Sequence, residues 1–409
     1  MDQDPQFRTA QEPKKMPQEL LKKAFAQFEK NFGSAPAVQT FAPGRVEILG
    51  NHTDYNQGLV LGVAIDRFTV VVGRPVPGTT ATIFADAFDQ TDAIDLSESS
   101  IDTGPEGDWR RYTRGVIWAL RSQLLANQGF EAVVMGNVPL GAGLSSSASL
   151  QVALGLFLQK LHGKSIENDE ARMGLAKRLR KAENGFVGVA SGLLDFVTVL
   201  FGRKGDAVFL DCQNLNVQRV SLGQNPPAIV VMDTSTSRRL ADGMYNIRRS
   251  ECERIVDHFR KLKSVSEVSS LRDITPEELS ANWKYLDPVG RLRVRHVLLE
   301  NQRVLDGVGA LNSGDLATLG LQVSRSHKSS MTDFQNSSEA LDTLVGSALT
   351  APGCLGAKLS GAGWAGCVVA LVEPDFVDQF TRLCAAGYRE KTGLEAEIYV
   401  AYSAGCSDA

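Results

Sequence analysis

The chain has 409 residues, with 43% hydrophobic and 22% charged side chains and a formal net charge of −4. This length predicts about two or three domains, and the composition is typical of a globular protein with a large core. It contains no basic stripe and no run near the roughly 20 apolar residues of a membrane span, so we expect neither nucleic acid nor membrane partners.

The six cysteines are dispersed without a CxxC pair, which indicates neither a zinc site nor a disulfide scaffold. The first residues, MDQDPQFRTAQEPKK, lack the apolar core of a signal peptide. We therefore expect a disordered tail over residues 1–15 and a cytoplasmic protein with reduced thiols. A monomer is a separate expectation that these features do not test.

The first predicted element is an amphipathic helix, because apolar residues from Leu20 to Phe32 recur at helical spacing and Gly33 follows as a stop. β-branched residues over 40–72 then predict extended segments on either side of a loop, GNHTDYN, at residues 50–56. That loop carries six consecutive polar side chains, whereas a plain turn needs one or two. The surplus indicates a site that binds a polar ligand.

A strand, a glycine loop and a helix are predicted over 131–163, EAVVMGNVPLGAGLSSSASLQVALGLFLQKLHG. Gly141 and Gly143 allow backbone N–H groups to turn toward a ligand. Three serines then fall at the first helical turn, where free amides and the helix dipole favour phosphate. Because an N-cap alone needs one serine, we interpret this segment as an anion site whose hydroxyls can also reach a magnesium ion.

The next unit is a charged helix over 170–184, an apolar run over 187–202 and a strand over 206–212. Asp195 is a lone carboxylate in that apolar run, and an unpaired buried charge costs on the order of several kcal/mol. Arg45 is a candidate partner; exposure to solvent is the alternative. The Asn-, Gln- and Pro-rich stretch over 213–227 is a candidate interdomain connection, and a strand over 228–232 follows it.

Two further glycine patterns are weak evidence for nucleotide binding. GKS at 163–165 lacks the first glycine of a P-loop, since Leu158 stands there within a predicted helix. GAGWAG at 361–366 fits GxGxxG, but a dinucleotide fingerprint opens a helix, whereas the CVVALV that follows reads as a strand. Taken alone, this pattern predicts a tight turn into a strand.

With these stretches the chain resembles the galactokinase branch of the GHMP family of small-molecule kinases, from about residue 38 to 402. Three family motifs occur in order: APGRVEILGNHTDYNQG, VPLGAGLSSSASLQVA and GAKLSGAGWAGCVVALV. SGLLDF, MDTSTSRRLADGMYNIRRSEC, RVRHVLLENQRVL and SRSHKSSMTDF look specific to that branch. The resemblance implies an α+β fold with the active site between two domains. These are a ribosomal-protein-S5-domain-2-like domain over 16–215 and a ferredoxin-like α/β domain over 216–409.

The resemblance also implies a function, the ATP-dependent phosphorylation of the C1 hydroxyl of galactose with Mg²⁺, so that ATP and a small sugar are the expected partners. By position, Arg45 and Asp195 look like the family's catalytic pair. The positions around the sugar are Glu47, Asn51, His52, Asp54, Gly192 and Tyr245. The positions around ATP are Trp109, Gly141, Gly143, Leu144, Ser145, Ser146, Ser147, Gly361 and Gly363, and those linked to magnesium are Ser147 and Glu183.

The chain departs from the usual family motif, GRVNLIGEHTDY, at two positions beside the sugar. The family has an acid where Asn51 stands and an asparagine where Glu47 stands. Asn51 can still accept from a sugar 6-hydroxyl and adds two donors. If the strand continues to Glu47, this acid shares a face with Arg45 and either pairs with it or points into a differently arranged pocket. Phe196 and Trp364 are further departures that can reshape the pocket.

Two other functions and several structural interpretations stay open. A sister sugar 1-kinase for galacturonate, N-acetylgalactosamine or arabinose is one, because Asn51 would not repel a C6 carboxylate. A non-catalytic sugar and ATP sensor is the other, although LSSSAS is complete. Asp195 is either a general base or an electrostatic anchor, since a neighbouring arginine favours its charged form. Taken alone, His52, Tyr245, Glu183 and Trp109 are each compatible with a purely structural role.

Overall fold

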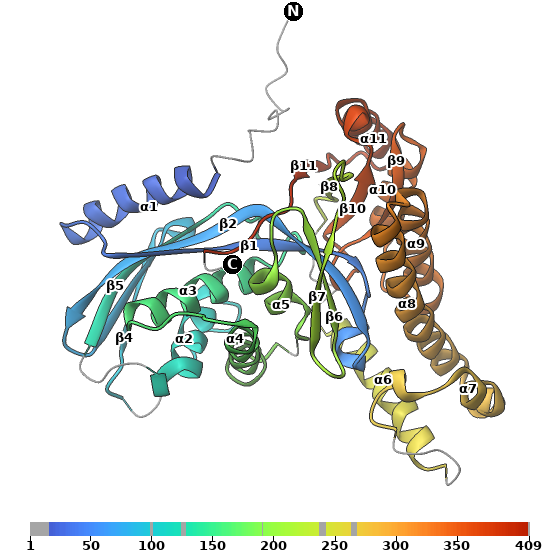
Figure 1. Cartoon of the computed structure of the whole chain (residues 1–409), viewed down its shortest axis with the longest axis horizontal. Helices are drawn as coiled ribbons and strands as arrows, with labels where there is room; N and C mark the ends of the chain where they lie inside the picture. Colours follow the sequence, from blue (N-terminus) through green and yellow to red (C-terminus); the bar gives the residue numbers. More distant parts are fainter. Residues whose placement is uncertain are drawn as a thin grey trace, which may run out of the picture.

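The computed structural model describes residues 16–98, 101–123, 128–189, 191–236, 243–262 and 268–407. Two lobes lie side by side, each built on one β-sheet (Figure 1). The disordered tail expected over 1–15 lies outside the described residues. Within the described part of the chain, no helix is both long and apolar enough to cross a bilayer.

The first lobe is built on a seven-stranded sheet in the order β4-β3-β5-β2-β6-β7, with β1 paired to β2. β3 runs parallel to β5, and the other neighbours are antiparallel. The predicted strands are confirmed. The strands are β1 (Val38–Leu49), β2 (Leu59–Pro77), β3 (Thr80–Ala85), β4 (Gln90–Asp95), β5 (Gln128–Gly136), β6 (Asp206–Asp211) and β7 (Asn216–Ser221).

Helices cover both faces of this sheet (Figure 1). The predicted first helix is α1 (Met16–Phe32), which packs Phe28 against Val70 and Val72 and ends at Gly33, whose φ is +74°. A larger core lies on the opposite face, under four helices that include the predicted phosphate-loop helix and the predicted charged helix. They are α2 (Trp109–Leu120), α3 (Ser146–Leu161), α4 (Asp169–Ala182) and α5 (Leu194–Phe201).

The second lobe contains an antiparallel sheet in the order β11-β8-β10-β9. Its strands are β8 (Ala228–Asp233), β9 (Cys354–Leu359), β10 (Cys367–Val372) and β11 (Glu397–Ala401). The helices of this lobe are α6 (Met244–Arg260), α7 (Pro276–Asn282), α8 (Pro288–Ser313), α9 (Leu316–Ser329), α10 (Glu339–Thr350) and α11 (Val377–Thr392). α10 and α11 pack on one face, whereas Val304 of α8 and Val323 of α9 join a core shared with Leu49 of the first lobe.

The chain passes from one sheet to the other over residues 222–227. The stretch predicted as a connection also contains β7, which forms a hairpin with β6 and therefore belongs to the first sheet. We propose that the domain boundary lies there, a few residues after the predicted division at 215/216. The C-terminal residues return to the first lobe, where Ser403 pairs with Ile65 and Cys406 is buried.

Candidate functional site

The expected ion pair between Arg45 and Asp195 is present. Arg45 Nε donates to Asp195 Oδ1 at 2.7 Å, and Arg45 Nη2 lies 2.5 Å from the same oxygen. The other carboxylate oxygen, Oδ2, accepts a short hydrogen bond from Ser145 Oγ. Arg45 Nη1 donates to the carbonyl oxygen of Gly143 at 2.6 Å. One carboxylate therefore joins strand β1 and helix α5 to the serine loop.

The serine loop has the backbone shape that its glycines predict. Gly141 and Gly143 have φ of +75° and +77°, and Ser145, the N-cap of α3, has φ of +56°. Leu144 is buried, and its carbonyl oxygen accepts from Arg45 N–H at 3.0 Å. The loop thus lies directly against β1, and Ser146 and Ser147 occupy the first turn of α3, where backbone N–H groups have no helical partner.

Glu183 is a buried carboxylate near the start of α3. Gln151 Nε2 donates to it at 3.0 Å, and the hydroxyls of Ser191 and Ser147 also donate to it. Burial, and then the charge of Asp195, raise the pKa of Glu183 to about 7. Gln151 Oε1 beside it is buried and has no hydrogen-bond partner among the residues that the structure describes. These carboxylate, hydroxyl and amide oxygens are hard ligands that suit magnesium, and a cation would relieve the buried negative charge.

Metal ligands in the described residues are too few to form a closed site, since no group of three or more His, Cys, Asp or Glu side chains is placed to hold an ion. Mg²⁺ commonly binds through one or two carboxylates together with substrate phosphates and water. Ser147 and Glu183 therefore fit magnesium only as part of a nucleotide complex.

Asp54, Gly192 and Tyr245 face the same region as Asp195. A Cβ on Gly192 would lie 1.6 Å from Asp54 Oδ2, so the Asp54 carboxylate rests against the Gly192 backbone. Burial, and then the Asp195 charge, raise the pKa of Asp54 to about 6. Burial raises the pKa of Tyr245 well above its usual value, and the charges of Asp54 and Asp195 add to that shift. Among the described residues, the hydroxyl of Tyr245 has no hydrogen-bond partner and is available to a ligand.

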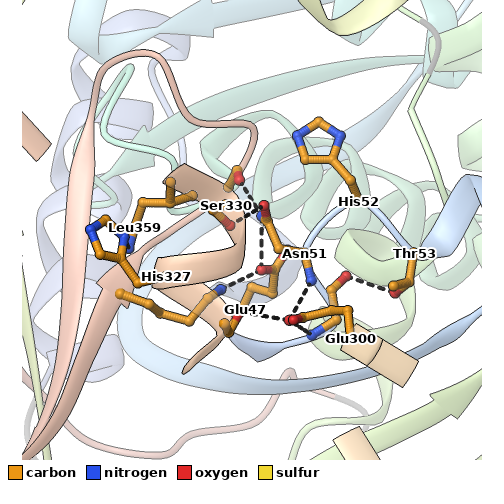
Figure 2. Close-up of polar contacts among 12 residues, drawn as sticks. Glu47, Asn51, His52, Thr53, Glu300, His327, Ser330 and Leu359 are labelled. Carbon is orange, nitrogen blue, oxygen red and sulfur yellow. Dashed lines mark hydrogen bonds and ion pairs between the residues drawn. The ribbon is translucent and has the colours of Figure 1, made fainter. Parts of the chain in front are cut away.

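Glu47 does not pair with Arg45. Its Oε1 accepts from Lys358 Nζ at 2.5 Å and from Asn51 Nδ2 at 3.1 Å, in a fully buried setting (Figure 2). The strand does continue through Glu47, as β1 is in register with β2 from Arg45 to this residue. The acid is therefore neutralised by the second lobe.

The side chains of Asn51 and His52 make all their hydrogen bonds within the protein. Asn51 Nδ2 also donates to Gly361 O at 2.8 Å. His52 Nε2 lies 2.9 Å from Ala362 O, and its Nδ1 lies 2.9 Å from the Tyr55 hydroxyl. Because a carbonyl can only accept, Nε2 carries the proton. Burial lowers the pKa of His52 to about 3, so the ring is neutral.

The turn at 361–366 lies beside the serine loop and leads into β10, as the sequence predicts. A Cβ on Gly361 would be 3.6 Å from Gly143 Cα, so the two loops are adjacent. Gly363, with φ of +90°, passes so close to Asn336 that a Cβ would lie 1.9 Å from the Asn336 carbonyl oxygen. The two lobes therefore meet at their glycine loops.

Trp109 lies at the start of α2 and is buried. Its Nε1 donates to Gln90 Oε1 at 3.2 Å, and its ring stacks on Phe88 with centroids 5.9 Å apart and planes 7° apart. Phe88 is the exposed ring of this pair, 45% accessible. An adenine contact at Trp109 stays a prediction.

Side chains of helix α8 hydrogen-bond to the backbone of the polar loop, a role that the sequence analysis did not predict. Glu300 Oε1 accepts from the backbone N–H groups of Gly50 and Asn51 at 3.0 and 3.2 Å (Figure 2). His296 Nε2 lies 2.9 Å from Asn51 O, and Asn301 Oδ1 accepts from Leu59 N–H at 2.8 Å. The i, i+4 spacing of His296 and Glu300 places them on one helix face. The sequence analysis also did not single out Lys358. This residue is a lone charge in the apolar strand GAKL, and the same pattern had singled out Asp195.

Family models match three parts of the chain. The galactokinase galactose-binding signature matches residues 26–75, the GHMP kinases N terminal domain residues 111–203 and the GHMP kinases C terminal domain residues 308–388. A galactokinase of Roseiflexus sp. (strain RS-1) is 40% identical over 377 residues, which cover 91% of this chain and 93% of the relative.

Solved structures of kinases are also similar to this chain. The crystal structure of Lactococcus lactis galactokinase complexed with galactose superposes with a TM-score of 0.87 at 31% identity, covering 95% of this chain and all of that one. Mevalonate kinase of Methanococcus jannaschii has a TM-score of 0.65 at 18% identity, covering 91% of this chain and 99% of that one, and is similar in fold.

Proposed function

Since this chain belongs to the galactokinase family of GHMP kinases, we propose that it transfers the γ-phosphoryl group of ATP to the C1 hydroxyl of galactose, giving galactose 1-phosphate and ADP. Phosphoryl transfer depends mainly on positioning and on charge stabilisation around the moving group. The phosphate side of the site supplies the charge stabilisation, and the sugar side supplies the positioning.

On the phosphate side, the first turn of α3 presents free backbone N–H groups, and Arg45 supplies positive charge next to them. Ser147 and Glu183 would hold Mg²⁺, which supplies charge neutralisation between phosphate oxygens when it is bound. The raised pKa of Glu183 supports this assignment because a cation nearby would favour its charged form.

On the sugar side, Asp54 and the Tyr245 hydroxyl are the groups that would bind sugar hydroxyls. Asp54 has one hydrogen bond among the described residues, from Tyr55 N–H at 2.9 Å, and its remaining oxygen faces Gly192. The missing side chain at Gly192 leaves room for the Asp54 carboxylate itself, which occupies the place of a Cβ there.

One observation carries the proposal: Asp195 is bonded to Arg45 and Ser145 of the phosphate side, and its charge acts on Asp54 of the sugar side. The reacting hydroxyl would therefore meet the phosphoryl group next to Asp195. Both carboxylate oxygens already accept from protein donors, which favours a role as electrostatic anchor over one as general base.

A substrate panel tests the proposal. Purified protein is incubated with ATP, magnesium and either galactose, galacturonate, N-acetylgalactosamine or arabinose, and both ADP and the sugar phosphate are measured. We expect turnover with galactose and a phosphate at C1. Turnover with another sugar but not with galactose would support a sister kinase, and binding of sugar and ATP without turnover would support a sensor. We also propose that the enzyme acts as a monomer and that it is cytoplasmic, in keeping with the lack of a disulfide among the described cysteines.

A further inference from the structure

The side chains of the polar loop GNHTDYN, residues 50–56, point in two directions. Asp54 faces Gly192, whereas the Asn51 side chain is buried and has no remaining hydrogen-bonding capacity. Its Nδ2 donates to Glu47 and to Gly361 O, and its Oδ1 accepts from Asn336 Nδ2 at 2.8 Å and from Ser330 Oγ at 3.3 Å (Figure 2). An amide has two N–H groups and two lone pairs, so all four are used. No part of this side chain is left for a ligand.

The His52 side chain bonds to the same turn as the Asn51 side chain. Its Nε2–H donates to Ala362 O, while its ring packs 4.6 Å from Phe334 and 5.3 Å from Tyr245, measured between centroids. Neighbouring side chains of the polar loop thus donate to neighbouring carbonyls, Asn51 to Gly361 and His52 to Ala362. Two consecutive bonds of this kind fix both the position and the direction of the receiving backbone.

The receiving turn is the one that lies against the phosphate side of the site. Gly361 is adjacent to Gly143, whose carbonyl oxygen accepts from Arg45. The buried Glu47 and Lys358 pair supports the same contact, since Lys358 lies on β9, the strand that leads into the turn, and Glu47 accepts from Asn51. A change at Asn51 is therefore transmitted to the backbone next to Arg45.

We propose that Asn51 and His52 are positioning residues that hold the turn 361–366 against the serine loop, rather than groups that contact the sugar. The proposal rests on the function given above and deepens it, because recognition of the primary-alcohol end of the sugar then does not depend on residue 51. Substitution of Asn51 should reduce turnover without changing the choice between galactose and 6-deoxygalactose.

Asn51→Asp is the sharpest test because it keeps the acceptor for Asn336 and Ser330 but replaces the donor by an oxygen. That oxygen would face Gly361 O and Glu47 Oε1, now 2.8 and 3.1 Å from Nδ2, and would repel both. Misplacement of catalytic groups by about 1 Å can cost roughly 100-fold in rate. We expect kcat to fall about 10- to 100-fold with each sugar, the ratio of the two kcat/KM values to stay within about twofold of the parent, and amide hydrogen exchange over 361–366 to accelerate.

Asn168→Asp is the matched control, because Asn168 is the N-cap of α4, has no place in the site, accepts from Ala171 N–H at 2.8 Å and keeps that acceptor after substitution. It should leave both the kinetics and the exchange over 361–366 as in the parent. If Asn51→Asp does not fold, His52→Phe replaces it: the ring and its packing stay, the Nε2 donor is lost, and the same kinetic split is expected.

The proposal is overturned if Asn51→Asp leaves kcat unchanged but shifts the preference between galactose and 6-deoxygalactose more than about fivefold, since residue 51 then contacts the sugar. Unchanged hydrogen exchange over 361–366 also overturns it. A parent protein that phosphorylates no sugar would refute the proposed function instead, and the exchange comparison would still decide whether Asn51 holds the turn.

Discussion

Replacing Asp195 by alanine perturbs the point where the phosphate and sugar sides meet. Asp195 accepts from Arg45 at 2.5 and 2.7 Å, and its side chain is 27% exposed. Loss of a positioned group costs about 10²- to 10³-fold in rate if it acts electrostatically and up to about 10⁴-fold if it acts as an acid or base, or about 3–5 kcal/mol of barrier at 1.36 kcal/mol per tenfold. Breaking a fully buried pair costs about 3–5 kcal/mol of stability. Because solvent reaches Asp195, we expect a smaller loss, about 1–3 kcal/mol.

The assay compares kcat, from ADP release with galactose, and the free energy of unfolding in the parent and two variants. Glu131→Ala is the matched control, since Glu131 pairs with Arg74 at 2.8 Å, is 25% exposed and lies on β5 away from the site. It should lose similar stability and no turnover. Asp195→Ala retaining more than a tenth of the parent kcat, or a control that loses as much, would refute the reasoning.

Asp195→Asn separates the two roles of this carboxylate. Asparagine keeps the size and one acceptor for Arg45 but cannot take a proton at neutral pH. For an electrostatic anchor we expect kcat about tenfold above that of Asp195→Ala. Equal loss in both variants would instead show that Asp195 must accept the proton.

Three other predictions concern the surroundings of Asp195. Gly192→Ala should raise the KM for galactose at least tenfold with the KM for ATP unchanged, because the new Cβ would displace Asp54 from its place 1.6 Å away; steady-state kinetics with each substrate varied check this. Lys358→Met should destabilise the fold by about 3–5 kcal/mol by leaving Glu47 buried and unpaired, and adding Glu47→Gln should recover most of that loss in denaturant unfolding. Burial raises the pKa of Asp54 from 3.8 to about 6. The protonated carboxyl therefore contributes to the free energy of unfolding below about pH 4, and this contribution should be lost as the pH rises to about 6. Asp54→Asn should reduce this slope, leaving the part that comes from Glu183, and kcat/KM for galactose should rise through about pH 6 as the Asp54 carboxylate forms; a slope unchanged in the variant would contradict the assignment.

The serine loop and the pairing of Asp195 followed from the sequence because both are local signals. Gly141 and Gly143 with a run of serines before an amphipathic helix predicted a glycine loop and an N-terminal anion site, and the loop is confirmed while the anion site stays a prediction. A lone carboxylate in an apolar run must be paired or exposed, and Arg45 was the candidate partner that the structure confirms. The same argument applied to Lys358 would have predicted a buried acid opposite it, and Glu47 is that acid.

The directions of Asn51 and His52 did not follow from the sequence. A polar loop indicates that ligands of some kind are bound, but it does not distinguish a sugar hydroxyl from a backbone carbonyl. Three of the four partners of the Asn51 side chain, Ser330, Asn336 and Gly361, lie about 280 to 310 positions away in the second lobe. Likewise β7 looked like a connection, since its strand signal is short and its pairing with β6 depends on a hairpin rather than on composition.

The sequence by itself determined part of the strand and helix order, the glycine-dependent loops and the charges that need partners, because these depend on periodicity and on the cost of burying a charge. Only the tertiary structure decided which polar groups of the loop at 50–56 remain available to a substrate. That choice depends on how the two lobes pack, since the Gly361 and Ala362 carbonyls take up Asn51 and His52 and leave Asp54 open toward Gly192.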